Sequence, residues 1–152
     1  MEHKKATRII LIEDSKAFLE VEDALYMGRI RFFLNKKDNS SPVYFFVKLD
    51  DALCMAYDMF TLREFTADYT ATGYDKNNQP IVRRFYLDTH VATDLEDDFY
   101  YYLDIDNLPG KMVGKNIEPI AEEEGKYTQI EIYPEDARRV GAAMLLRLLA
   151  NL

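Results

Sequence analysis

The feature that most constrains the fold of this chain is a pattern that occurs twice, in which short strands of alternating polarity are followed by one apolar helix. The first set of strands ends at residues 43–49 and enters a helix at 50–60. The second set ends at residues 127–133 and enters a helix that begins at Pro134. Apolar residues at every second position indicate strands, and a period near 3.6 indicates helices. The sequence therefore predicts an α+β protein made of two pseudo-repeated ββββα units.

The first unit spans residues 6–62. Its four predicted strands are residues 6–12, 17–21, 29–35 and 43–49. The segment 37–42 (KDNSSP) is typical of a turn, because its side chains bond locally or interrupt a strand ladder. Asp50 is predicted to cap the following helix.

The second unit spans residues 63–152. Its four predicted strands are residues 64–72, 81–88, 99–105 and 127–133. Residues 108–110 (LPG) indicate a turn, and 111–125 are predicted to be a loop. Together the units form a single domain, 1–152, with antiparallel sheets and with helices packed on one side.

The C-terminal helix is apolar on more than one face. Ala137, Val140, Met144 and Leu148 form one stripe, and several further leucines widen it. Such a helix needs more than one surface to pack against. We therefore expect a homodimer or a higher assembly through helix 137–152.

Cysteine content and hydropathy constrain the location of the protein. The single cysteine, Cys54, excludes an internal disulfide and is typical of a reducing cytosol, so we expect a cytoplasmic protein. Its position among apolar helix residues predicts a buried thiol. No apolar run approaches the roughly 20 residues needed to span a bilayer, so we expect no membrane partner.

The net charge of −8 is concentrated in one segment. Residues 92–136 contain 13 acidic and 3 basic side chains, whereas the rest of the chain contains 14 acidic and 16 basic ones. A strongly acidic protein is an unusual partner for nucleic acid. Here the acidity belongs to one segment, and the remainder of the chain is close to neutral.

The sequence contains no clear catalytic or metal-binding constellation. His3 and His90 have no partner at metal-ligand spacing, and the six glycines form no phosphate-binding loop. Asp104 and Asp106 lack the glycine-bearing loop of a calcium site and are predicted to be a solvated acidic rim. We therefore expect no enzymatic activity, no cofactor and no metal.

Outward positions of the predicted strands combine cations with aromatic rings. Rings of this kind stack on nucleobases while Arg and Lys contact phosphates, which favours single-stranded nucleic acid. An alternative is that these rings pack beneath a loop or a neighbouring subunit. The candidate binding residues are Arg29, Arg31, Phe33, Tyr44, Phe46, Lys48, Arg84 and Tyr86.

Two short stretches, residues 31–37 (RFFLNKK) and 84–88 (RFYLD), place Arg, two aromatic residues and Leu at similar points of the two units. With four strands and a helix occurring twice, the chain resembles the single-stranded-DNA-binding superfamily of Whirly proteins, PUR-repeat proteins and PC4-type coactivator dimers. The resemblance covers the order of elements and little residue identity, and the lysine-rich Whirly signature has no counterpart. It implies that the strands bind nucleic acid and that the helices pair subunits.

Three hypotheses follow for function. The leading one is a non-enzymatic protein that binds single-stranded DNA or RNA on an aromatic and basic sheet face. The alternative is a protein-interaction module, in the extreme a DNA mimic, whose acidic segment 92–136, including residues 122–124, meets a basic partner. The third is a small accessory protein with neither activity.

Overall fold

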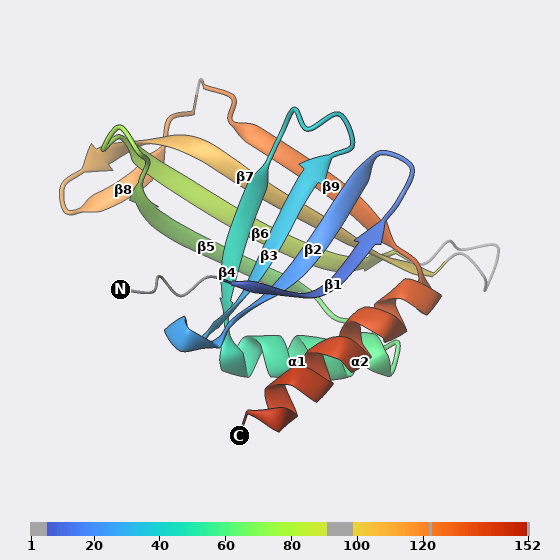
Figure 1. Ribbon diagram of the computed structural model, residues 1–152. Coiled ribbons are helices and arrows are strands. Elements are labelled where there is room, and N and C mark those ends of the chain that lie inside the picture. The colour runs from blue at the N-terminus through green and yellow to red at the C-terminus, as the bar shows by residue number, and fades with distance from the viewer. Residues whose placement is uncertain (1–5, 91–98, 122, 152) are drawn as a thin grey trace.

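The computed structural model describes residues 6–90, 99–121 and 123–151. It contains two antiparallel sheets and two helices, so the predicted α+β class is confirmed. In Figure 1 the strands of the first sheet cross in front of those of the second, and both helices lie together at one end of the sheets. None of the helices in the described ranges is long and apolar enough to cross a membrane.

The first sheet is an antiparallel meander in which each strand pairs with its neighbour in sequence. Its strands are β1 (Thr7–Glu13), β2 (Ala17–Ala24), β3 (Arg29–Lys36) and β4 (Val43–Lys48). A short 3-10 turn, η1 (Leu25–Met27), connects β2 to β3, and helix α1 (Leu49–Phe60) follows β4 directly. Alternate residues of β4 are buried and partly exposed, as the sequence predicts.

The second sheet departs from the predicted four strands. Its strands are β5 (Ala67–Tyr74), β6 (Pro80–His90), β7 (Tyr100–Val113), β8 (Asn116–Pro119) and β9 (Lys126–Ile132). Strands β5, β6, β7 and β9 pair in that order, and helix α2 (Pro134–Ala150) follows.

The predicted turn at 108–110 is wrong, and the predicted loop at 111–125 is wrong for residues 111–113 and 116–119, which belong to strands. Strand β7 continues through Pro109, which pairs opposite Ile81, and then forms a hairpin with β8. Gly114 has a φ of 63°, which suits the tight turn of that hairpin. A Pro-Gly pair does not end this strand because the partner strands β6 and β8 hold it in register.

The two sheets face each other across a shared apolar core. Phe32 on β3 and Phe45 on β4 lie 5.2 and 5.6 Å, between ring centroids, from Phe85 on β6. Tyr69 on β5 stacks against both Phe45 and Phe85. Aromatic side chains bury roughly 150–250 Å² each, so they dominate the energy of such a core. Each sheet therefore has one buried inner face and one outer face.

The helices pack closely on each other. An added Cβ at Gly141 of α2 would lie 2.6 Å from the carbonyl oxygen of Ala56 and 2.6 Å from the amide nitrogen of Phe60, both on α1. Helix α1 also contacts β3 and β4, whereas α2 contacts β1 and β7. The helices therefore contribute their buried residues to the core that the two sheets share.

Two local predictions about α1 are wrong. The thiol of Cys54 is exposed, because the buried stripe of the helix is formed by Ala52, Met55, Ala56 and Met59. The helix begins at Leu49, and Lys48 is its N-cap without a side-chain capping bond. Asp50 therefore lies in the first turn, where a carboxylate interacts favourably with the helix dipole.

Candidate nucleic-acid interface

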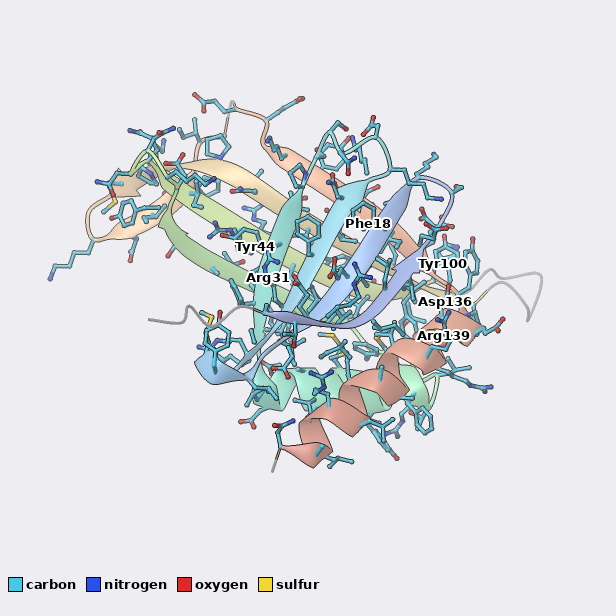
Figure 2. The ribbon with its side chains drawn as sticks, in the orientation of Figure 1. Phe18, Arg31, Tyr44, Tyr100, Asp136 and Arg139 are labelled. Carbon is cyan, nitrogen blue, oxygen red and sulfur yellow. The ribbon has the colours of Figure 1, made fainter. Side chains whose placement is uncertain are left out.

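Six of the eight predicted binding residues lie on the outer face of the first sheet. Because β3 and β4 are antiparallel and in register, the six form three cross-strand pairs. The pairs are Arg29 with Lys48, Arg31 with Phe46, and Phe33 with Tyr44. Figure 2 shows Arg31 and Tyr44 close together on this sheet. We call this surface the first outer face.

Arg84 and Tyr86 do not join that surface. Phe85 and Leu87, which alternate with them along β6, are fully buried, and Phe85 contacts the rings of the first sheet. Arg84 and Tyr86 therefore project from the opposite side of the molecule, on the outer face of the second sheet. The structure divides the predicted residues between two surfaces.

Arg31 lies at the centre of an aromatic cluster. Its guanidinium carbon is 5.2 Å from the ring centroid of Phe33, 4.7 Å from that of Tyr44 and 6.0 Å from that of Phe46. These distances fall within the range of cation–π attraction. Strand alternation places these rings on the outer face, where they are partly exposed.

A second guanidinium reaches the same ring from the other sheet. Arg83 of β6 donates a hydrogen bond of 2.8 Å from Nη2 to the Tyr44 hydroxyl, and its guanidinium carbon lies 4.5 Å from the Tyr44 ring centroid. Tyr44 therefore contacts both Arg31 and Arg83. We call these three residues the Arg–Tyr–Arg cluster.

The two arginines of the cluster differ in charge compensation. Arg31 forms an ion pair with Glu22 of β2, which is only 9% exposed. In the described part of the chain, no carboxylate lies within ion-pair distance of Arg83, and its Nε is buried without a hydrogen-bond partner. An unpaired, partly buried cation attracts an anion more strongly than a paired one.

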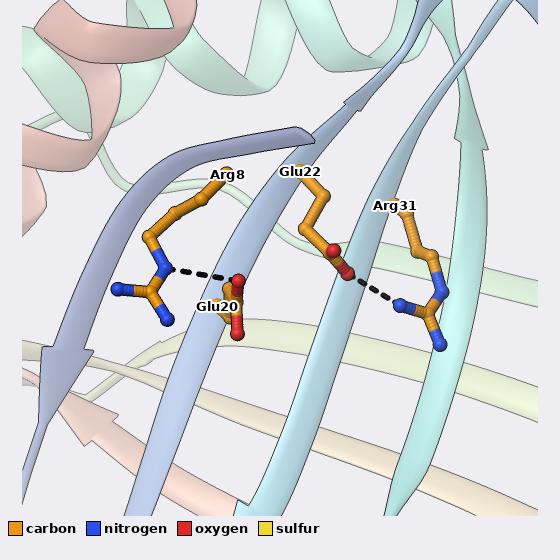
Figure 3. Close-up of polar contacts among 4 residues, drawn as sticks. All are labelled: Arg8, Glu20, Glu22 and Arg31. Atoms are coloured by element: carbon orange, nitrogen blue, oxygen red, sulfur yellow. Dashed lines mark hydrogen bonds and ion pairs between the residues drawn. The ribbon is translucent and has the colours of Figure 1, made fainter. Parts of the chain in front are cut away.

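Carboxylates of β2 reduce the positive charge of the first outer face. Figure 3 shows the ion pairs of Arg8 with Glu20 and of Arg31 with Glu22, side by side across the sheet. The hydrogen bond and the charge of Glu20 raise the pKa of Arg8. The face therefore combines partly exposed rings with a modest excess of cations, and is less basic than the sequence predicts.

A groove borders the first outer face where edge strand β4 approaches edge strand β5. It has a volume of about 390 Å³. Arg29, Phe46 and Lys48 contribute to its lining from the first sheet, and Tyr69 contributes from the second. The carboxylates of Asp51 and Asp68 also line the groove, so its cations are partly offset. An extended chain that crosses the rings of the face would reach this groove next.

Sequence reasoning missed three members of this surface. Phe18 of β2 lies with its ring centroid 6.1 Å from that of Phe33, and Glu22 pairs with Arg31. Strand alternation along β2 could have identified both, because it places Phe18 and Glu22 on the same outer face as Arg31 and Phe33. Arg83 carries no such signal, because its place beside Tyr44 depends on how the two sheets cross.

The residues considered for metal binding do not form a site. Across residues 6–90, 99–121 and 123–151, no three side chains of His, Cys, Asp or Glu are placed to hold a metal ion. The ring of His90 lies 4.8 Å from that of Tyr100. His3 falls outside the described residues.

The chain was compared with known proteins in three ways. No family model matches it, and neither the curated proteins nor the solved structures contain a match.

Proposed function

We propose that this protein binds single-stranded DNA or RNA, without catalysis, on the first outer face. The observation that supports the proposal is the Arg–Tyr–Arg cluster, in which Tyr44 contacts two guanidinium groups and one of them lacks a carboxylate partner. The cluster brings together an aromatic ring and guanidinium groups, the two kinds of group that such a ligand requires.

The rings supply contacts that do not depend on base sequence. Phe18, Phe33, Tyr44 and Phe46 are partly exposed and lie on three neighbouring strands. A base stacked on one ring contributes about 1–3 kcal/mol in comparable proteins. Rings spread across three strands suit successive unstacked bases, whereas a duplex would hide its bases from them.

The cations supply contacts to the phosphates. Arg83 has a guanidinium without an ion pair in the described ranges, and Arg29 and Lys48 lie opposite each other at the rim of the groove. Arg31 becomes available only when a phosphate competes with Glu22. We therefore expect moderate affinity that falls steeply as the salt concentration rises.

The order of elements supports a relationship with the Whirly, PUR-repeat and PC4-type superfamily. Both halves contain an antiparallel meander that ends in a helix, β1 to β4 with α1 and β5 to β9 with α2. The inserted hairpin of β7 and β8 distinguishes the second half. Under the proposed pseudo-repeat, the outer faces of the two sheets occupy equivalent positions in the two halves. They differ in charge, since one is cationic and the other acidic.

The proposed assembly uses the apolar surface of the helices. Leu146 is 72% exposed and Leu149 is 56% exposed on α2, and Tyr57 and Phe60 of α1 are also exposed. Large exposed apolar side chains on two helices that contact each other favour contact with a second copy. A homodimer or higher assembly through the helices would leave the first outer face open.

The function can be tested by fluorescence anisotropy with labelled oligo-dT and oligo-rU at low salt. We expect binding that weakens as salt is added, and the Tyr44→Ala variant to lose about 5- to 150-fold in affinity, equivalent to 1–3 kcal/mol. Tyr86→Ala is the matched control, because it removes a tyrosine from the other sheet. Absence of binding by the wild type at tens of micromolar, or equal losses in both variants, would contradict the proposal.

A further inference from the structure

The outer face of the second sheet carries an array of tyrosines. They project from β6, β7 and β9 and from the residue after β9, on the side opposite the buried Leu87, Leu103 and Ile130. Tyr127 and Tyr133 are about half exposed, and the ring centroids of Tyr100 and Tyr133 lie 5.5 Å apart. The array consists of Tyr86, Tyr100, Tyr102, Tyr127 and Tyr133.

Carboxylates alternate with these rings across the strands. The register pairs Tyr86 with Asp68 on one side and Asp104 on the other, and it pairs Tyr127 with Asp106. The corresponding neighbours of Tyr102 are Asp88 and Glu131. We call this surface the tyrosine–acid face. Three of its five rings therefore have a carboxylate in an adjacent cross-strand position.

Neutral donors hold these carboxylates in place. Asp88 accepts hydrogen bonds from the hydroxyls of Tyr86 and Thr66, at 2.7 and 2.8 Å. Asp104 accepts one from the Gln129 amide at 3.1 Å, and Glu131 accepts one from the Tyr133 hydroxyl at 2.6 Å.

The negative charge of the tyrosine–acid face is not compensated from within. Among the described residues, none of its carboxylates forms an ion pair, in contrast to Glu20 and Glu22 on the first outer face. Arg84 projects from the same face opposite Asp106, outside ion-pair distance. The face is therefore an ordered set of aromatic and anionic groups in which the carboxylates outnumber the nearby cations Arg84 and Lys36.

The chain itself contains one example of a cation on this array. The Lys36 ammonium reaches from the first sheet to lie 5.3 Å from the ring centroid of Tyr127. A ring flanked by carboxylates attracts a cation through both its quadrupole and its neighbours. Tyr86 and Tyr102 also have carboxylates in adjacent cross-strand positions.

We infer that the tyrosine–acid face binds an arginine-rich segment of a partner protein. Charge complementarity selects a basic partner, and it excludes nucleic acid because phosphates would be repelled. The alternation of rings and carboxylates selects arginine over lysine, because a guanidinium can stack on a ring while it donates two parallel bonds to the adjacent carboxylate. This inference does not rest on nucleic-acid binding by the other face.

The tyrosine–acid face differs from the acidic interaction surface that the sequence predicts at residues 92–136. Glu123 and Glu124 lie exposed on the connection between β8 and β9, without an adjacent ring in the tyrosine array. Glu122 is outside the described residues. Asp68 and Asp88 belong to the tyrosine–acid face although they precede residue 92 in the chain. Sheet pairing, and not the density of acid along the sequence, defines the surface.

The charge of the face changes near neutral pH. Burial, a hydrogen bond with Asp104 and the negative charge of Asp104 raise the pKa of Asp106 to about 7, against a smaller lowering by Arg84. Tyr86 on β6 and Gln129 and Tyr127 on β9 complete the polar surroundings of the pair. Because arginine does not titrate in this range, peptide binding should strengthen as the pH rises through about 7.

The test is an anisotropy titration of the full chain with a labelled peptide that alternates arginine and glycine, and with its lysine counterpart. We expect the arginine peptide to bind several-fold more tightly. Asp104→Asn/Asp106→Asn should weaken binding by about tenfold or more, as loss of two charge-assisted contacts implies. The matched control is Glu123→Gln/Glu124→Gln, which removes the same charge from an acidic surface without rings.

A second pair of variants distinguishes peptide binding on the tyrosine–acid face from nucleic-acid binding on the first outer face, and also tests whether a loss of binding reflects misfolding. Tyr86→Ala should lose peptide affinity and keep its affinity for oligo-dT, whereas Tyr44→Ala should show the reverse. Far-UV circular dichroism verifies the fold of each variant. The inference is overturned by absence of peptide binding, by equal binding of both peptides, or by equal losses in the Asp104/Asp106 and Glu123/Glu124 variants.

Discussion

The hydroxyl of Tyr44, on the edge strand of the first sheet, accepts a 2.8 Å hydrogen bond from Arg83 of the second sheet. This bond brings a guanidinium from the far half of the chain to a face otherwise built from the first half. It also couples the proposed binding surface to the way in which the two sheets pack.

Arg83→Gln should weaken the binding of oligo-dT by about tenfold, because it removes a cation that has no internal ion pair in the described ranges. The slope of log K against log salt should fall by about one, as expected when one phosphate contact is lost. Arg84→Gln, the neighbouring change on the opposite face, should leave both quantities unaltered. An unchanged salt slope in Arg83→Gln would show that Arg83 contacts no phosphate.

Glu22→Gln should tighten the binding of oligo-dT. The carboxylate of Glu22 competes with phosphate for Arg31, and a neutral amide competes less well. An increase of about 3- to 10-fold is expected, equivalent to the roughly 1 kcal/mol of a partly exposed ion pair. Asp136→Asn is the control, because it breaks the exposed Arg139 ion pair on α2. Weaker binding by Glu22→Gln would mean that Glu22 positions Arg31 for its ligand.

Gly141→Ala should lower the free energy of unfolding. The new methyl group would meet the backbone of α1 at Ala56 and Phe60, and backbone atoms cannot rotate away. Overpacking costs about 1–3 kcal/mol, and the gain of roughly 1 kcal/mol in helix propensity offsets only part of it. Urea denaturation measures the difference. Gly73→Ala is the control, since its added Cβ would meet only Arg83 Nη1 at 3.8 Å; equal effects would argue against a close helix contact.

The stability of the protein should fall as the pH rises through about 7, because of Asp106. Its pKa is raised to about 7 in the folded state, so the folded protein holds a proton that the unfolded chain releases near pH 4. The stability that this proton contributes is present at low pH and is lost as the carboxyl ionises. Since the group is partly exposed, we expect a loss of only about 1–2 kcal/mol between about pH 5 and pH 8.

Asp106→Asn should remove this part of the pH dependence and should be more stable than the wild type at about pH 8. Urea denaturation at several pH values gives both free energies of unfolding. Identical pH profiles for the two proteins would show that Asp106 titrates normally.

Leu146→Glu/Leu149→Glu should convert an assembly of this chain into a monomer. Both leucines are largely exposed on α2, so the change costs little in the fold of one subunit, whereas an apolar interface would have to bury two charges. Light scattering after size-exclusion chromatography measures the mass. Met112→Glu, at an exposed apolar position of the β7–β8 hairpin, is the control. A wild-type mass equal to one chain at high concentration would rule out the proposed assembly.

The sequence by itself determined the local elements of this protein. Alternation of polarity along residues 43–48 predicts strand β4, its buried positions and the outward Tyr44, Phe46 and Lys48. Pro134 similarly marks the start of α2. These features depend on residues within a few positions of each other, so they can be recognised without the rest of the fold. The continuation of β7 through Pro109 could not be recognised in this way, because its partner residues on β6 are distant in the chain.

Only the tertiary structure decided which residues share a surface. The arginine-aromatic stretches of the two halves appear equivalent in sequence, but the face-to-face packing of the sheets sends Arg31 and Arg84 to opposite sides of the molecule. The same packing turns Arg83, which strand alternation assigns to the inner face, toward Tyr44. Side-chain direction along a strand is a local property, whereas the crossing of two sheets is set by the fit of Phe32, Phe45 and Phe85 in the core.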